Sequence, residues 1–505
     1  MKKKVFSYAV AIALVLLVSS FMPLLLFFNN VEAISFVEVL IFMGTFSGIG
    51  LVIFTILRLI TKSEYKAAAI TAVVTLIYQN IGRLQSLIGH WPVILLFAAL
   101  MVGIGFLTKK LITEEISKIF TPVFALTLSM LCILNTVTTL GRITAKANVS
   151  SEVAAEVAQQ VKHLSEYKAN KHTEEKLPNI YFFLPDEYAG FNSAEKFLDH
   201  DNKEFKTFLE NNNFTISTTS TNYSSGTMEC LADVFNLEIN EQNRYENTSE
   251  AYCKTKTANG ALFKIIEELG YDVRAFQPID LINYESESAQ TGKLWSTNAD
   301  GELSIEIMLK PTILYPLRDA GLQILNLVTN GASVGGGVVK SLAKVNAEPL
   351  LYFTKDDAEY TDNTFNFCYS LIPHNPYYYD AEGNIIQTNT EHNNVETPKN
   401  YLDQYKYTTT LLTKSIENIL ENDPDSIIIL MSDHGLRIKE GAADTWMKDM
   451  TPKDNADILC AVYCKGEEFA DIEGLCGANV MITLLNEVYG YEIPYIAQSD
   501  DYYFE

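Results

Sequence analysis

The segment IIILMSDHG, residues 427–435, places groups that could bind a metal ion directly after a run of apolar residues. The run is too short for a helix, and its β-branched residues favour a strand buried on both faces, as in a parallel sheet covered by helices. Ligands of such sheets bind at the carboxyl ends of the strands. Ser432, Asp433 and His434 stand at that end, so they are candidates for a binding site.

A second segment repeats this pattern. PNIYFFLPDEYAG, residues 178–190, is another short apolar strand, and it stops at the adjacent carboxylates Asp186 and Glu187. Carboxylate and imidazole together suit zinc, manganese or magnesium, of which magnesium accepts histidine least well. Each segment alone could be an ordinary exit from a strand into a loop. Together they predict one divalent metal ion held at the edge of a sheet.

From Leu177 onward, strand-like and helix-like segments alternate along the chain. The clearest helical segments are residues 194–211, GALFKIIEELG, residues 400–421 and residues 477–488. This alternation predicts an α/β domain over residues 177–505, with a mostly parallel sheet flanked by helices. Residues 280–350 fit no clear element. Their run GASVGGG, residues 331–337, is expected to form a mobile loop. A phosphate-binding glycine loop is disfavoured, because no strand precedes this run and no Lys-Ser/Thr pair follows it at the required spacing.

The first 145 residues have the pattern of a membrane region. Five apolar runs each approach the roughly 20 residues that span a bilayer, and they cover residues 5–28, 34–61, 67–88, 92–108 and 117–140. Gln79, Asn80 and Arg83 interrupt the third run. The basic start of the chain would also suit a signal peptide, but the run after it is long and others follow closely. The polar segment 146–176 reads as a linker that is partly helical in period.

Lysine and arginine residues lie at alternate ends of these runs, and basic ends are typically cytoplasmic. Five crossings then place the domain 177–505 on the opposite, extracytoplasmic side of the membrane. Residues 1–145 carry 11 basic and 5 acidic side chains, so their net charge is +6 and that of the remaining chain is −30. A domain this acidic argues against nucleic acid as a partner. The sequence gives no indication of an oligomeric state.

Six of the seven cysteines lie in the outer part of the chain, where disulfides can persist. The sequence-local pairs Cys230 with Cys253 and Cys464 with Cys476 are the first candidates. The other two lie within apolar strand-like segments and read as buried thiols. No CxxC pair occurs, which disfavours a thiolate zinc site.

Six segments in the same order resemble those of membrane-anchored members of the alkaline-phosphatase/sulfatase superfamily. They are PNIYFFLPDE, TNYSSGT, SLIPHNPYYYDAEGN, YLDQYKYTTTLL, IIILMSDHG and ANVMITLLNEVYGYEIP. The resemblance covers residues 177–500 and the membrane layout. It is closest to lipoteichoic acid synthase-like and phosphoethanolamine or phosphoglycerol transferase-like proteins, in which five membrane helices precede an extracellular catalytic domain. It implies an enzyme that moves a phospho-head group from a lipid or polyol phosphate to a cell-envelope acceptor.

The resemblance implies a metal-binding role for four residues besides the nucleophile. Asp186 stands at the position of the first acidic ligand, and Asp433 and His434 stand at the ligands of the SDHG strand. Glu187 stands where sulfatases have a second acidic ligand. One divalent ion, manganese, zinc or magnesium, is the implied cofactor.

Thr227 stands at the nucleophile of the family, where the resemblance implies a hydroxyl that also binds the metal and forms a covalent phospho-threonine. A hydroxyl is a weak nucleophile at neutral pH, so it needs a metal to favour the alkoxide. Thr227 precedes an apparent helix, whose first amides favour an anion. Ser224 and Ser225, beside it, are alternative nucleophiles. His374, in IPHNP, stands at the histidine that contacts the substrate.

Other activities remain open to different degrees. Formylglycine sulfatases carry Cys/Ser-x-Pro-x-Arg at the nucleophile, and the corresponding stretch TMECL lacks it, which disfavours that reaction. With water as the acceptor, the same site would be a phosphodiesterase or a sulfuric ester hydrolase. An inactive membrane-anchored scaffold would usually have lost a ligand. A transporter is disfavoured because the membrane runs carry few charges and no repeat.

The alternating basic ends predict the topology. Tags inserted at residue 62 and at residue 170 should lie on opposite sides of the membrane, the second one outside. Protease added to intact cells should therefore digest the domain after residue 177. If that domain is digested only after the cells are lysed, the five-crossing topology is wrong.

Overall fold

The computed structural model describes most of the chain. The described residues are 2–29, 36–110, 112–167, 177–224, 226–239, 250–279, 281–284, 286–287, 308–328, 336–386, 397–437, 449–465 and 469–498. They belong to two compact units, one of residues 1–145 with 294–335 and one of residues 146–293 with 336–505. The expected glycine-rich loop falls largely outside the described residues, as does the end of the expected linker, residues 168–176.

The first unit consists of helices. In chain order they are α1 (Lys2–Asn29), α2 (Phe36–Thr61), α3 (Glu64–Tyr78), α4 (Gln85–Ile88), α5 (His90–Lys110), the first part of α6 (Glu114–Ser165) and α13 (Leu314–Val328). Four helical stretches are long and apolar enough to cross a membrane, namely Val5–Asn29, Val39–Thr61, Glu64–Ile88 and Glu114–Gly141, and His90–Phe106 is a shorter apolar helix. These stretches coincide with the five apolar runs of the sequence. The number of crossings and their orientation stay predictions.

The interruption of the third apolar run has a structural cause. Helix α3 ends at Tyr78, whose carbonyl accepts a hydrogen bond from the backbone N–H of Ile313 (2.7 Å). A Cβ atom at Gly82 would lie 2.2 Å from the carbonyl oxygen of Thr312, so this close approach requires glycine. The stretch that fits no clear element in the sequence therefore packs, in part, on the helices of the first unit.

The second unit begins within α6, so the expected linker is helical up to Ser165. Val153, Val157 and Leu164 of this helix are buried in the core of the second unit. Their spacing places them on one face of a helix. Residues 153–165 are thus a packed part of the second unit.

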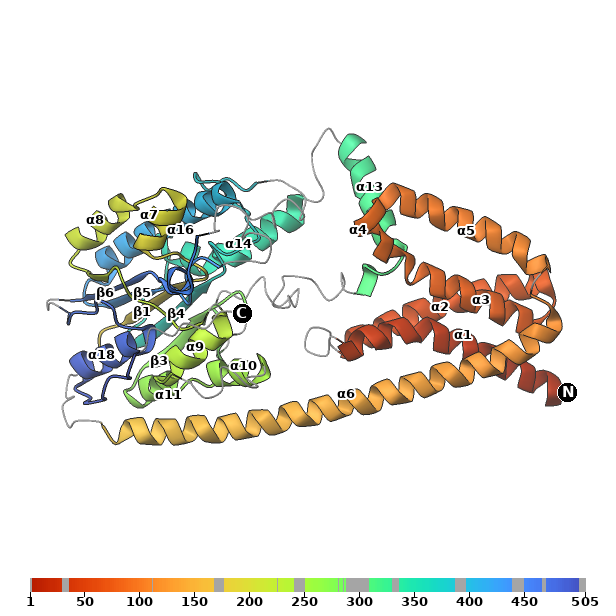
Figure 1. Cartoon of the computed structure of the whole chain (residues 1–505), viewed down its shortest axis with the longest axis horizontal. Helices are drawn as coiled ribbons and strands as arrows, with labels where there is room; N and C mark the ends of the chain where they lie inside the picture. The colour runs from red at the N-terminus through yellow and green to blue at the C-terminus, as the bar shows by residue number, and fades with distance from the viewer. Residues whose placement is uncertain are drawn as a thin grey trace. The chain divides into compact units, whose positions relative to one another are not determined.

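A six-stranded mixed sheet forms the centre of the second unit (Figure 1). The strands are β1 (Ile180–Pro185), β2 (Thr215–Ser217), β3 (Asp272–Phe276), β4 (Thr364–Ser370), β5 (Ile427–Met431) and β6 (Cys460–Cys464). Their order is β2-β6-β5-β1-β4-β3. The neighbours β5, β1, β4 and β3 pair in parallel, whereas β6 is antiparallel to both β5 and β2.

Helices cover both faces of this sheet (Figure 1). The end of α6 with α9 (Thr227–Asn236), α11 (Ala261–Glu268) and α18 (Gly477–Tyr489) covers one face, and α7 (Phe191–Leu198), α8 (Lys203–Asn211), α14 (Gly336–Phe353) and α16 (Pro398–Asn422) cover the other. Successive side chains of β1 alternate between the two cores: Phe182 lies in one, and Tyr181 and Phe183 lie in the other. The predicted α/β domain with a mostly parallel sheet is confirmed.

The expected disulfides are not formed. All seven cysteines are thiols. The sulfur of Cys230, in the first turn of α9, donates to the carbonyl of Ser224 (3.1 Å). Cys368 on β4 and Cys460 on β6 are buried, as the strand-like pattern indicated.

The buried carboxylate of Asp457 lies at the start of helix α7. Asp457 accepts hydrogen bonds from the backbone N–H of Ser193 (2.8 Å), while its own carbonyl accepts one from Gly190 (3.0 Å). Burial raises the pKa of Asp457 to about 6, although the hydrogen bonds from Ser193 lower it. The folded state therefore favours the protonated form, and the contribution of Asp457 to stability falls as the pH rises from about 4 to about 6.

Asp457→Asn should therefore raise the apparent melting temperature of the full chain in detergent at pH 7.5. The gain should be smaller at pH 4.5. The shift in the pKa of Asp457 limits the gain in the free energy of unfolding to about 3 kcal/mol. Asp454 provides an opposite control, because hydrogen bonds from Lys196 and Thr451 outweigh burial and lower its pKa. Asp454→Asn should lower the melting temperature at pH 7.5. A pH-independent gain for Asp457→Asn would contradict this explanation.

Candidate active site and metal centre

Two neighbouring parallel strands bring the candidate ligands together. The pairing of Ile180 with Ile427 and of Phe183 with Leu430 puts the carboxyl ends of β1 and β5 at the same edge of the sheet. Asp186 follows β1 directly, and Asp433 and His434 follow β5 after one residue. All three side chains are buried.

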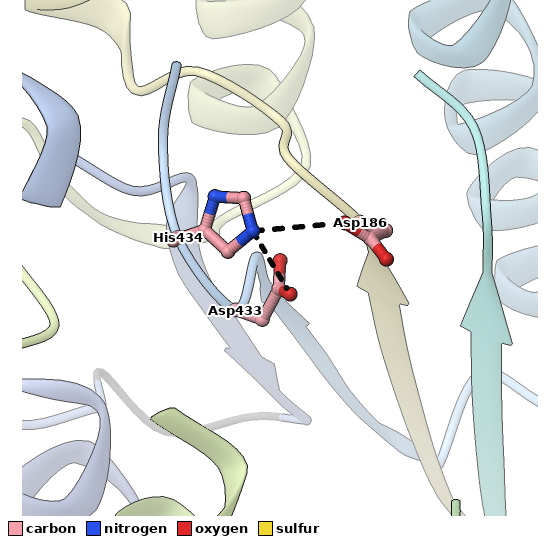
Figure 2. Close-up of side chains that lie close together, drawn as sticks. All are labelled: Asp186, Asp433 and His434. Carbon is pink, nitrogen blue, oxygen red and sulfur yellow. Dashed lines mark ion pairs between the residues drawn. The ribbon is translucent and has the colours of Figure 1, made fainter. Parts of the chain in front are cut away.

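One atom of each of these three side chains points to a common place (Figure 2). His434 Nε2 lies 3.8 Å from Asp186 Oδ1 and 3.5 Å from Asp433 Oδ2. The ligand atoms all lie within 4.8 Å of one another. Within the described part of the chain, none of these three buried atoms has a hydrogen-bond partner. Two carboxylate oxygens and an imidazole nitrogen in this arrangement suit a divalent metal ion.

The remaining polar atoms of the same three residues are held by the protein. Asp186 Oδ2 accepts from the hydroxyl of Tyr369 on β4 (2.5 Å), and Asp433 Oδ1 accepts from the backbone N–H of Glu187 (3.0 Å). His434 Nδ1 lies 2.8 Å from the carbonyl oxygen of Gly435. Because a carbonyl only accepts, Nδ1 carries the proton and Nε2 keeps the lone pair of the neutral ring. Such outer contacts orient metal ligands.

The electrostatics of the cluster also favour a bound cation. Burial, and next the charge of Asp433, raises the pKa of Asp186 well above its usual value, although Arg437 and the hydrogen bond from Tyr369 lower it. Burial followed by the charge of Asp186 likewise raises the pKa of Tyr369. A divalent ion among the ligand atoms would offset the free-energy cost of burying two charged carboxylates, because it would pair with both of them.

Ser432, at the end of β5, hydrogen-bonds to two neighbouring segments of the site. Its hydroxyl donates to the carbonyl of Tyr188 (2.8 Å) and accepts from the backbone N–H of Leu459 (3.0 Å). These two bonds tie the end of β5 to the loop after β1 and to the segment before β6. The hydroxyl is thereby used in positioning Asp433 and His434.

Glu187 lies beside the converging atoms but is not one of them. It is fully buried, and its backbone has a φ of 59°, a conformation that non-glycine residues seldom adopt. Its carboxylate accepts from the backbone N–H of Arg437 (3.2 Å) and lies 3.6 Å from both the Arg437 guanidinium and His374 Nε2. Glu187 thus lies between two basic side chains, Arg437 and His374.

His374 lies next to this cluster because helix α16 holds its loop. The backbone N–H of His374 donates to the carbonyl of Asp186 (3.2 Å). From α16, the side-chain amide of Gln404 donates to the carbonyls of Pro373 (3.1 Å) and His374 (2.8 Å), and the hydroxyl of Tyr401 donates to the carbonyl of Glu187 (2.6 Å). The motif YLDQYKY therefore positions the loops of the site.

Thr227 is the first residue of helix α9, as the sequence indicated. Gly226 precedes the helix in an extended conformation, and its N–H donates to the hydroxyl of Ser224 (3.2 Å). Ser224 is thus engaged in shaping the turn. Ser225, the other alternative nucleophile, lies outside the described residues.

Two residues of the site carried no recognisable signal in the sequence. Tyr369 reads as one more aromatic residue of a buried strand, and only the pairing of β4 with β1 shows that its hydroxyl reaches Asp186. Arg437 follows the SDHG motif after one further residue, and this closeness to a predicted metal ligand was the one available hint.

Comparisons with known proteins give distant similarities. No family model and no curated protein matches the chain. The zinc complex of the periplasmic domain of EptC from Escherichia coli is 13% identical, with a TM-score of 0.38 over 64% of this chain and 87% of that chain. The lipooligosaccharide phosphoethanolamine transferase A from Neisseria meningitidis, an integral membrane protein, is 13% identical, with a TM-score of 0.36 over 94% of both chains.

A protein of the alkaline phosphatase superfamily from Vibrio parahaemolyticus is 14% identical, with a TM-score of 0.36 over 66% of this chain and 75% of that chain. Because these TM-scores lie below 0.5, the function of this chain is inferred from its own residues.

The contacts of the ligands predict a graded loss of metal. Asp433→Asn removes one of the two converging carboxylates, so the full chain purified in detergent should lose bound Mn²⁺ or Zn²⁺ while staying folded. Tyr369→Phe removes only the hydrogen bond to Asp186, so the metal affinity should fall by about tenfold to a hundredfold. Elemental analysis and titration calorimetry give the two quantities.

Tyr181→Phe is the matched control for Tyr369→Phe. Tyr181 is also a buried tyrosine of the sheet whose hydroxyl donates to a carboxylate, that of Asp423 (2.8 Å), but this carboxylate is not among the converging ligands. Its loss should leave the metal affinity unchanged. Equal metal content in Asp433→Asn and the parent protein would remove Asp433 from the site.

Proposed function

We propose that this chain is a metal-dependent transferase that moves a phospho-head group, of phosphoglycerol or phosphoethanolamine type, from a lipid donor to an acceptor of the cell envelope. The observation that carries the proposal is the convergence of three buried ligand atoms, from Asp186, Asp433 and His434, which have no hydrogen-bond partner in the described part of the chain. The ordered motifs that resemble membrane-anchored transferases support the same reaction. Apolar helices of membrane-spanning length suit a lipid donor.

A bound divalent ion would stabilise negative charge on the phospho-group and on the attacking oxygen. Two buried carboxylate oxygens and His434 Nε2, which have no hydrogen-bond partner among the described residues, could hold this ion. Thr227 is the proposed nucleophile. It is the first residue of α9, and the N-terminus of a helix favours an anion.

The proposed reaction has two balanced steps. In the first, Thr227 Oγ1 loses its proton and forms a bond to phosphorus, the bond from phosphorus to the donor's alcohol oxygen breaks, and that oxygen takes up one proton as it leaves. In the second, an acceptor hydroxyl loses its proton and forms a bond to phosphorus, the bond from phosphorus to Thr227 Oγ1 breaks, and Oγ1 takes up one proton, which restores the threonine. His374 is the proposed contact of the ester or leaving oxygen, because its ring lies beside the cluster on a loop held by Gln404.

Substitutions at Thr227 test the nucleophile. Thr227→Ala should abolish turnover of a phosphodiester by the full chain while the metal stays bound, and Thr227→Ser should keep part of the activity because the hydroxyl survives. When the acceptor is withheld, mass spectrometry should find a phospho-adduct on Thr227. His374→Ala should lower turnover with little change in metal content.

Ser224→Ala is the matched control, since Ser224 carries a hydroxyl three residues away on the same segment. It should keep its adduct on Thr227 and most of its activity. Undiminished turnover in Thr227→Ala would move the nucleophile to a serine or to water. A site that uses water directly would be a hydrolase, and the transferase proposal would then fail.

A further inference from the structure

Arg437 is a basic side chain beside the candidate metal ligands, and the proposed reaction gives it no role. Its guanidinium lies 3.6 Å from Glu187 Oε2, and its backbone N–H donates to Glu187 Oε1 (3.2 Å). The side chain is only 25% exposed. Its Nε–H is buried and has no hydrogen-bond partner within the described residues. A buried donor of this kind usually has a partner, so the unused N–H indicates a ligand.

The charges nearby show what kind of ligand fits. Burial alone would lower the pKa of Arg437, but the carboxylates of Glu187, Asp186 and Asp433 raise it, so the guanidinium stays charged. With a divalent ion bound, the ion and Arg437 together balance these three carboxylates. The Nε–H of Arg437, which has no partner among the described residues, can then donate to an anion that approaches the ion.

A guanidinium suits one class of anion in particular. Its planar N–H groups match two oxygens of a tetrahedral phospho-group, and such paired bonds are shorter and stronger than those of a single ammonium. Glu187 restrains this group twice, once through the backbone and once through the side chain, which lowers the entropy lost when an anion binds. Glu187 also lies 3.6 Å from His374 Nε2, so the same carboxylate lies beside both basic groups.

We infer that Arg437 is the residue that binds the non-bridging oxygens of the phospho-group, and that Glu187 holds it in place for this purpose. This inference rests on the proposed function and adds the residue that recognises the substrate class. Arg437 contacts the anion without contacting the metal. Its loss should therefore weaken anion binding while the metal stays in place.

The test uses the full chain in detergent, loaded with Mn²⁺, and labelled inorganic phosphate in equilibrium dialysis. Arg437→Gln should keep the metal content of the parent protein and bind phosphate about tenfold to a hundredfold more weakly. Arg437→Lys, which keeps the charge but loses the paired geometry, should bind with intermediate affinity. In the second arm, micelles containing phosphatidylglycerol should displace the label from the parent protein. Micelles containing only diacylglycerol should not, which distinguishes a lipid phosphodiester from free phosphate.

Arg274→Gln is the matched control. Arg274 also lies 3.4 Å from a glutamate, Glu287, but on the edge strand β3 and outside the metal centre. Its phosphate affinity should equal that of the parent protein.

Two results would overturn the inference: unchanged phosphate affinity in Arg437→Gln with full metal content, or loss of the metal from both Arg437 variants, which would make Arg437 a charge-balancing residue. A parent protein that binds metal and phosphate and turns over a phosphodiester, combined with either result, would leave the proposed function intact. A metal-loaded parent protein that neither binds phosphate nor turns over a phosphodiester would instead remove both.

Discussion

The structure depends on burying three carboxylates side by side at one edge of a sheet. Asp186, Glu187 and Asp433 are almost without solvent exposure, and Arg437 is the cation that the described residues place among them. Taking a carboxylate out of water costs several kcal/mol unless a cation or hydrogen bonds compensate. Hydrogen bonds satisfy part of each group, and the oxygens of Asp186 and Asp433 that have no partner within the described residues converge with His434 Nε2. A divalent ion would balance the negative charge that remains. The folding of this edge and the binding of the ion are therefore coupled.

The scaffold around this edge is built to keep the ligand atoms fixed. The parallel pairing of β1 with β5 sets the spacing of the two acidic strand ends, and β4 adds the hydroxyl of Tyr369 from the other side of β1. Helix α16 then holds the loop of His374 and the backbone of Glu187 through Gln404 and Tyr401. Rigid strands and a buried helix thus position side chains that lie on loops, which keeps a site ordered before any ligand binds.

Much of this arrangement follows from local sequence patterns. The apolar runs before Asp186 and Asp433 predict buried strands, and the convergence of their carboxyl ends follows from the rule that parallel strands share an edge. The same alternation of strand and helix predicts the α/β fold, which the structure confirms. Apolar runs of bilayer length likewise locate the helices of the first unit.

Features that depend on tertiary contacts were not accessible from the sequence. The bonds of Ser432 to Tyr188 and Leu459 could not be predicted, because they join segments that are distant in the sequence. The packing of Ile313 on the helices of the first unit joins segments more than two hundred residues apart. The two expected disulfides are not formed, because closeness in the sequence does not fix the distance between two sulfurs in the fold. The roles of Thr227 and His374 stay predictions.

Anomalous diffraction from crystals of the full chain grown with Mn²⁺ or Zn²⁺ tests the central claim most directly. Data collected above and below the absorption edge of the metal locate the ion and identify it. We expect one strong peak within coordination distance of Asp186 Oδ1, Asp433 Oδ2 and His434 Nε2, roughly 2.0–2.2 Å for zinc. A well-ordered site without a peak, or a peak held by other side chains, would contradict the account.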